Sequence, residues 1–173
     1  MIRSNHYEAA FEAYLRDRGL GYVAVDEAKR TVLGEKDVKN VDFIVVGPES
    51  AKLVVDVKGR KFPSGTSLAS WQNWTEAEDI DGLDRWASHF GAGFRGLLAF
   101  VYEIQPPYIL ADTTPDYFGF RHRHYLVRGI AVAEYRRHMR QRSPKWNTVH
   151  LPAAEFRKIV KPFSAFLKPD SLR

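Results

Sequence analysis

The sequence predicts a single α/β domain with the element order αβββαβ and a basic C-terminal extension. Three observations favour this fold class: a helical spacing of apolar residues near the start, two β-branched runs joined by a Gly-Pro turn, and a second helical pattern that leads into a long apolar strand. We assign residues 1–173 to one domain, with the core at about 1–115 and the extension at about 116–173.

The first helix is predicted at about residues 6–18. Asn5 and Glu8 form a capping-box pattern, and Gly19 stands where a helix C-terminal glycine belongs. The apolar residues between these signals recur at helical spacing, and they are Tyr7, Phe11, Tyr14 and Leu15.

Three strands are predicted next. Tyr22–Val25 is a short β-prone run, and the charged stretch Asp26–Asn40 that follows has a turn signal at Gly34. Val41–Val46 and Lys52–Gly59 are β-branched runs that a Gly-Pro turn joins, so we expect adjacent antiparallel strands.

A second helix and a buried strand complete the predicted core. A capping-box pattern from Thr75 to Glu78 precedes apolar residues at helical spacing over Ile80–Phe90, and Gly91 is the stop signal. Phe94–Ile104 then predicts a buried strand that a proline pair ends.

The C-terminal part has weaker patterns. Phe118–Val127 and Gly129–Ala133 predict a hairpin, Glu134–Arg142 a very basic helix, Thr148–Leu151 a strand, and Ala153–Val160 a last helix.

Composition excludes several classes of protein. The hydrophobic fraction is 45% and the charged fraction 27%, which excludes intrinsic disorder. The absence of cysteine excludes disulfide frameworks, thiolate zinc sites, iron–sulfur clusters and cysteine nucleophiles. The longest apolar run, Leu97–Tyr102, is far shorter than the ~20 residues of a membrane helix. With no apolar stretch at the start, we expect a soluble, cytoplasmic protein.

Charge is unevenly distributed along the chain. Residues 1–120 carry a net charge of −5 and residues 121–173 a net charge of +10, within a total of +5. This segregation favours a polyanion partner for the basic part, and a solvated basic face without a partner is the alternative.

Two aspartates lie within the β-branched runs. An unpaired carboxylate there costs several kcal/mol of desolvation, so Asp42 and Asp56 need compensation. Strand alternation places Asp56 and Lys58 on one face, opposite Leu53, Val55 and Val57. A hairpin can bring Asp42 alongside Asp56, and a divalent metal between them, Mg²⁺ or Mn²⁺ with these hard oxygen ligands, relieves their repulsion. The alternative is an Asp56–Lys58 ion pair, with Asp42 capping a turn.

These residues resemble the PD-(D/E)xK nuclease superfamily: Asp42, then Asp56-Val57-Lys58 on the adjacent strand, after a helix that carries Glu8. The helix resembles that of Holliday junction resolvases and Mrr-like nucleases, and the string His6–Glu12 is similar to the HYE-x-AFE group of predicted nucleases. The motifs cover residues 6 to about 90, roughly half of the chain. Val41 stands before the first aspartate where the motif has proline, a common substitution in the superfamily.

The resemblance implies a restriction-endonuclease-like core with a mixed sheet and a metal-dependent phosphodiesterase activity. Asp42, Asp56, the carbonyl of Val57 and Glu8 would hold Mg²⁺ or Mn²⁺, and Lys58 would steady the attacking hydroxide or the developing charge.

The roles of two glutamates stay open. Glu8 is either a metal ligand or the capping-box acid of its helix. Glu12, one turn later on the same face, is either a ligand to a second metal or a solvated residue.

Several aromatic, amide and basic residues are candidates for binding nucleic acid. Trp71 could stack on an unpaired base and Gln72 could contact phosphate, although core packing and a surface position are the alternatives. The basic candidates in the extension are Arg121, Arg123, Arg136, Arg137 and Arg140.

We therefore expect a metal-dependent nuclease with DNA favoured over RNA, which could work as a homodimer. The alternatives are a non-catalytic nucleic-acid-binding module on the same fold and a structural protein whose basic surface meets a protein partner. No Walker-type phosphate loop is present, which argues against ATP-driven activity.

Overall fold

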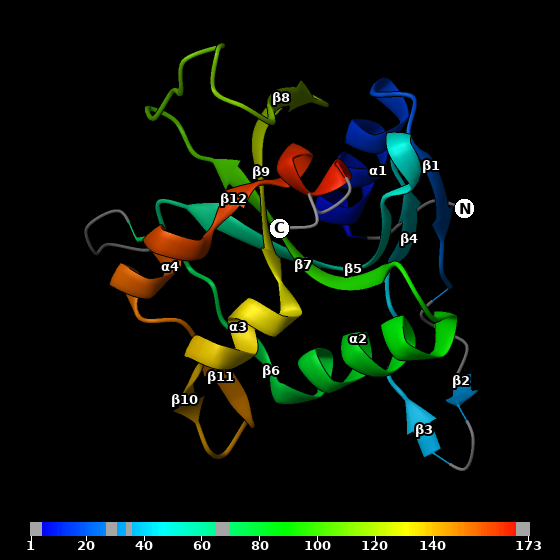
Figure 1. The fold of residues 1–173 in the computed structure, drawn as a ribbon. Helices are drawn as coiled ribbons and strands as arrows, with labels where there is room; N and C mark the ends of the chain where they lie inside the picture. The colour runs from blue at the N-terminus through cyan, green and yellow to red at the C-terminus, as the bar shows by residue number, and fades with distance from the viewer. Residues whose placement is uncertain (1–4, 27–30, 34–35, 65–69, 169–173) are drawn as a thin grey trace.

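A mixed sheet forms the centre of the molecule in the computed structural model, which describes residues 5–26, 31–33, 36–64 and 70–168 (Figure 1). Within these residues the strand order is β1-β4-β5-β7-β9-β12, with β8 paired to β9. β5 and β7 are parallel over eleven residue pairs, and the other neighbours are antiparallel. The strand bounds are β1 (Gly21–Ala24), β4 (Phe43–Val46), β5 (Lys52–Phe62), β7 (Phe94–Ile104), β8 (Tyr117–Phe120), β9 (Arg123–Ala131) and β12 (Lys161–Pro162).

Helices cover both faces of this sheet. The helix α1 (His6–Asp17) and the 3-10 helix η2 (Phe163–Leu167) pack on one face. The other face is covered by α2 (Ala77–Phe90), α3 (Val132–His138) and α4 (Ala153–Ile159). In the described residues, none of the helices has the length and apolar character to cross a membrane.

The smaller elements lie at the periphery. A two-stranded hairpin, β2 (Thr31–Leu33) with β3 (Lys36–Val38), is inserted between β1 and β4. A three-stranded sheet has the order β10-β11-β6, and its strands are β6 (Thr75–Glu76), β10 (Arg140–Ser143) and β11 (Thr148–His150). A 3-10 turn, η1 (Pro48–Ser50), joins β4 to β5.

The predicted αβββαβ core is confirmed. Along the central sheet the elements follow in the order α1, β1, β4, β5, α2, β7, with β2–β3 as an insertion. The Asn5 side chain accepts a hydrogen bond from the backbone N–H of Tyr7, and Gly19 ends the helix with a φ of +64°. The turn predicted at Gly34 lies outside the described residues.

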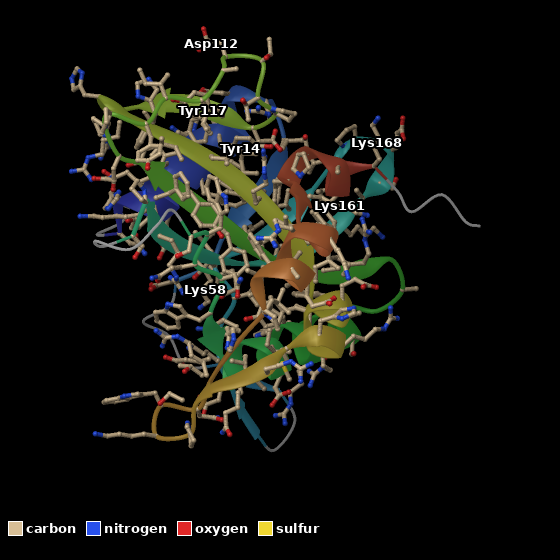
Figure 2. All side chains as sticks on the ribbon, turned by 90° about the vertical axis from the view of Figure 1, so that its left-hand side faces the viewer. Tyr14, Lys58, Asp112, Tyr117, Lys161 and Lys168 are labelled. Atoms are coloured by element: carbon tan, nitrogen blue, oxygen red, sulfur yellow. The ribbon has the colours of Figure 1, made fainter. Side chains whose placement is uncertain are left out.

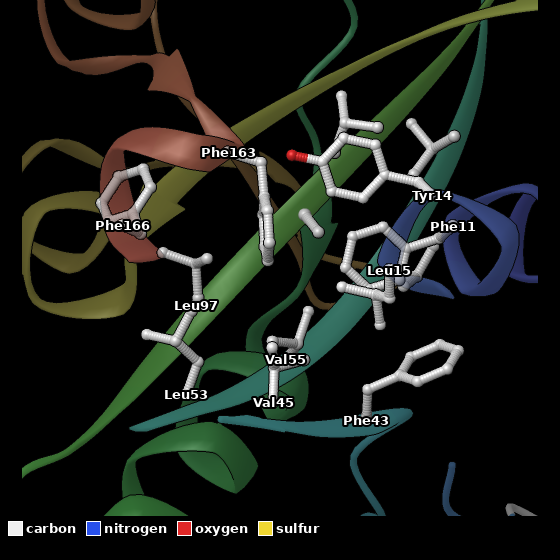
Figure 3. Packing of buried hydrophobic residues seen from close by; sticks show 14 of the residues in the cluster. Phe11, Tyr14, Leu15, Phe43, Val45, Leu53, Val55, Leu97, Phe163 and Phe166 are labelled. Carbon is white, nitrogen blue, oxygen red and sulfur yellow. The ribbon is translucent and has the colours of Figure 1, made fainter. Parts of the chain in front are cut away.

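Aromatic packing fixes α1 to the sheet. The ring of Phe11 contacts those of Phe43 and Phe163 at centroid distances of 5.2 and 5.1 Å (Figure 3). A Cβ atom at Gly59 would overlap the ring of Tyr7, so glycine lets the start of α1 approach β5 closely. This packing places the first turn of α1 against the C-terminal half of β5.

Two C-terminal predictions are wrong in their boundaries. The hairpin turns at Arg121 and His122, both with positive φ, and Arg128 lies within β9. Because neither turn residue is glycine, the sequence carries no turn signal there. The predicted helix over Glu134–Arg142 is α3 followed by β10, since residues 140–143 pair with β11 and this long-range pairing overrides local propensity.

The N-terminus of α2 differs by one residue from the prediction. The capping box joins Glu76 and Asp79 rather than Thr75 and Glu78. Thr75 instead belongs to β6, and its hydroxyl donates a hydrogen bond to Asp79 at 2.7 Å. This one-residue shift turns Asp79 toward the sheet.

Candidate active site

Asp42 and Asp56 lie side by side on neighbouring segments of the sheet. Phe43 pairs with Val55, so the preceding residue Asp42 falls beside Asp56. The backbone N–H of Asp42 donates to the carbonyl of Val55 at 3.0 Å, and its carboxylate accepts the N–H of Val57 at 2.6 Å. The two aspartates are only 3% and 6% exposed. The fold therefore buries two acids at one place on the face that α2 covers.

Lys58 connects Asp56 to an acid of α2. Its Nζ lies 2.7 Å from a carboxylate oxygen of Asp56 and 2.7 Å from one of Asp79 (Lys58 is labelled in Figure 2). Asp79 also contacts Nζ of Lys39 at 2.6 Å and accepts the hydroxyl of Thr75. The Asp56–Lys58 ion pair considered from the sequence is thus present, and it is part of a larger buried network.

Burial and ion pairing act differently on the two acids of this network. Burial raises the pKa of Asp56 to about 6, although Lys58 acts in the opposite direction. Burial also acts to raise the pKa of Asp79, but Lys58 and Lys39 outweigh it and lower that pKa to about 2. Burial acts to lower the pKa of Lys58, and its two carboxylate partners raise it overall. Lys58 therefore stays charged, and Asp56 is the acid whose negative charge is least stabilised.

The chemistry of the acid pair fits a divalent metal ion. One buried oxygen of Asp56 accepts no hydrogen bond of good geometry from the described residues, and its close neighbour is Nζ of Lys58. Throughout the described ranges, no three His, Asp or Glu side chains converge as a metal-binding group. The ligands at hand are the carboxylates of Asp42 and Asp56 and the carbonyl of Val57, which leaves positions for water or substrate oxygens, as Mg²⁺ prefers.

Glu8 and Glu12 belong to a separate network on α1. Glu8 is buried and accepts a hydrogen bond from the side chain of Asn5 at 3.0 Å, so its carboxylate contacts the N-cap residue of its own helix. Glu12 accepts the hydroxyl of Tyr22 at 3.0 Å and contacts Arg16 at 3.5 Å. Neither joins Asp42 and Asp56 in a three-acid group. Their roles as metal ligands stay predictions.

Trp71 and Gln72 precede β6 and have partners within the protein. Trp71 stacks on Phe62 with a centroid distance of 3.6 Å and an interplanar angle of 8°. Gln72 donates to the hydroxyl of Ser64 at 2.8 Å and accepts the indole N–H of Trp74 at 3.2 Å. Packing thus occupies one face of Trp71, and these contacts hold the segment in place.

Within the described ranges of the chain, three of the basic candidates form ion pairs and two form none. Arg123 pairs with Glu103, Arg136 with Asp81 and Asp84, and Arg137 with Glu134. Arg121 lies in the β8–β9 turn and Arg140 on β10, both exposed. An exposed ion pair can exchange its acid for a phosphate at small cost, so the nucleic-acid role of all five stays a prediction.

Sequence reasoning missed Asp79 and Lys39 as members of the site. Asp79 belongs to an acidic group near the start of the predicted helix, and a favourable interaction with the helix dipole accounts for its charge without reference to the sheet. Lys39 belongs to a charged stretch typical of a solvated loop. The signal that could have found Asp79 is its capping position at the start of an amphipathic helix that must pack beside Lys58.

No protein-family model matches the chain, and neither does any curated protein. Among solved structures, it matches Hjc, a Holliday junction resolvase from the archaeal hyperthermophile Archaeoglobus fulgidus, with a TM-score of 0.54. The match covers 93% of this chain and 98% of that chain at 14% identity. The fold resembles that of a Holliday junction resolvase. This likeness confirms the restriction-endonuclease-like α/β fold, and the HYE-x-AFE group stays a prediction.

Proposed function

We propose that the protein is a metal-dependent nuclease that hydrolyses phosphodiester bonds in DNA. The observation that carries the proposal is the buried acid pair Asp42 and Asp56, with the charged Lys58 beside it. An acid with a burial-raised pKa is a costly feature that a scaffold has no need to keep. The resolvase-like fold and the basic C-terminal part support DNA as the substrate.

Each residue of the site has a task in this reaction. A bound Mg²⁺ or Mn²⁺ would polarise the scissile phosphate and lower the pKa of a water molecule. Asp42 is oriented by the backbone N–H of Val57, so its carboxylate has one oxygen engaged and a fixed direction. Lys58 is held by Asp79 and donates to the negative charge that develops during attack.

A cleavage assay with matched variants tests this function. Duplex, branched and single-stranded DNA and single-stranded RNA are incubated with and without Mg²⁺ or Mn²⁺. We expect metal-dependent cleavage of DNA, reduced about 10²-fold or more in Asp56→Ala. Asp84→Ala serves as the control, because Asp84 is a half-exposed acid of α2 that pairs with Arg136.

Two outcomes would contradict the proposal. Cleavage at the wild-type rate by Asp56→Ala would show that the site is elsewhere. Tight, salt-sensitive DNA binding without cleavage under any metal would favour the non-catalytic binding module.

A further inference from the structure

A pocket lies near the buried network of Asp56, Lys58 and Asp79. The pocket has a volume of about 380 Å³ and is lined by residues 70–74, which precede β6, and by residues of β10, α4 and the end of β11. This volume is within the ~300–1,000 Å³ range of small-ligand pockets. Its lining combines aromatic, basic and amide side chains, including Trp71, Gln72, Trp74, Arg142, His150 and Arg157. Such a lining suits a ligand that has a flat ring and a negative charge.

Trp74 is held as a rigid wall of this pocket. The guanidinium groups of Arg60 and Arg142 lie 4.1 and 4.9 Å from the centre of its ring. Its indole N–H donates to the side chain of Gln72 at 3.2 Å. Because two guanidinium groups already lie over this ring, a nucleobase would pack beside the indole, and an indole fixed in this way loses little entropy when the base binds.

The pocket also presents cations that have no acid partner among the residues that the structure describes. Arg142 and Arg157 are both exposed, and neither forms an ion pair with any described residue. Nδ1 of His150 is buried and has no hydrogen-bond partner among the described residues. This differs from Arg136 and Arg137, which are paired with acids. Guanidinium groups free of carboxylates are well suited to bind phosphate.

The pocket is linked to the candidate active site by hydrogen bonds of the residues between them. Arg60 follows Lys58 by two residues, so both side chains project from the same face of β5. Arg60 donates to the carbonyl of Trp74, and the next residue, Thr75, donates to Asp79. From Asp56 to Arg60 the strand spans about 13 Å. A nucleotide in the pocket is therefore close to a phosphate held at the acid pair.

We propose that this pocket binds one unpaired nucleotide of the DNA substrate, with its base against Trp74 and its phosphate on Arg142 and Arg157. The inference rests on the proposed nuclease function and gives it a substrate class. The preferred DNA has an unpaired segment next to the cleavage position, as in a flap or a branch, because a base within a fully paired duplex must first be unpaired and unstacked at a cost in free energy before it can enter a pocket.

The test measures binding in EDTA, where no cleavage occurs. Fluorescence anisotropy compares a single-stranded oligonucleotide, a duplex with a single-stranded flap, and a blunt duplex. We expect the wild type to bind the first two at least tenfold more tightly than the third. Arg142→Ala/Arg157→Ala lowers the affinity for those two about tenfold and for the blunt duplex less than twofold. The control, Arg16→Ala/Arg85→Ala, removes two exposed arginines elsewhere and changes all three affinities alike.

The outcomes separate this inference from the nuclease function. An unchanged affinity in the Arg142→Ala/Arg157→Ala variant, or an equal loss for all three DNA molecules, overturns the pocket and leaves metal-dependent cleavage standing. Flap-selective binding that depends on these arginines, in a protein that cleaves nothing, supports the pocket and overturns the nuclease.

Discussion

The two faces of strand β5 have opposite characters. On the face that α1 covers, Leu53, Val55 and Val57 are buried among aromatic and aliphatic side chains. On the face that α2 covers, Val54 is followed by Asp56 and Lys58. One face is a uniform apolar layer, whereas the other ends in a network of buried charges. Both faces contribute a buried apolar cluster, and the comparison indicates that only the end of the α2 face adds charged groups suited to chemistry.

The largest expected effect is a loss of stability on the α1 face. Phe11 is fully buried between Phe43 and Phe163, so Phe11→Ala removes these contacts and leaves a cavity. We expect the free energy of unfolding to fall by about 3–5 kcal/mol, as measured by urea denaturation. A loss below about 1 kcal/mol would show that the apolar layer does not carry the fold.

Removing the charge of Asp56 from the α2 face is expected to raise the free energy of unfolding rather than lower it. Because burial raises the pKa of Asp56 to about 6 from an ordinary 3.8, its ionised form destabilises the folded protein above pH 6. In EDTA at pH 7.5, Asp56→Asn should raise the free energy of unfolding by up to roughly 3 kcal/mol.

The pH dependence and the metal dependence supply the controls. The gain should shrink as the pH falls from 6 toward 3.8 and vanish below 3.8, where the wild-type carboxyl is protonated in both states. Added Mn²⁺ should stabilise the wild type and leave Asp56→Asn unchanged. A variant less stable than the wild type at pH 7.5 without metal would contradict this account.

Asp79 is expected to stabilise the same face through its ion pairs. Its folded-state pKa of about 2 lies below the ordinary 3.8, so its contribution is complete above pH 3.8 and disappears as the pH falls through 2. Asp79→Asn should lower the free energy of unfolding by roughly 2 kcal/mol at pH 7. Denaturation curves at pH 7 and pH 2 should show the difference between variant and wild type vanish at the lower pH.

The smallest expected effect concerns the position of Lys58 rather than its charge. Asp79→Asn removes one of its two carboxylate partners, so we expect roughly a tenfold fall in kcat for DNA cleavage and little change in KM. Asp84→Asn, on the exposed side of α2, is the matched control. If both variants cleave at the wild-type rate, Asp79 serves stability alone.

Local signals in the sequence were sufficient for most of the core. The Gly-Pro turn predicts the pairing of Val41–Val46 with Lys52–Gly59, and alternation predicts that Asp56 and Lys58 share a face. These predictions are confirmed because strand period and turn chemistry are short-range properties. The same patterns therefore predicted the part of the charged network that lies on β5, which is Asp56 and Lys58.

Long-range contacts account for what the sequence did not reveal. Arg140 and Arg142 fit a continuing helix, but pairing with β11 makes them part of a strand. This strand places Arg142 over Trp74, a contact between residues 68 positions apart. Asp79 likewise fits an acid that interacts with the helix dipole, because its contact with Lys58 depends on how α2 packs on the sheet.

The most direct test of the central claim is the anomalous difference map of a crystal soaked in Mn²⁺. The account predicts a peak within coordination distance of the carboxylates of both Asp42 and Asp56, and no peak in a crystal of Asp56→Asn. A map without density at these two aspartates, from protein that cleaves DNA in the same Mn²⁺ solution, would contradict the claim that this acid pair holds the metal.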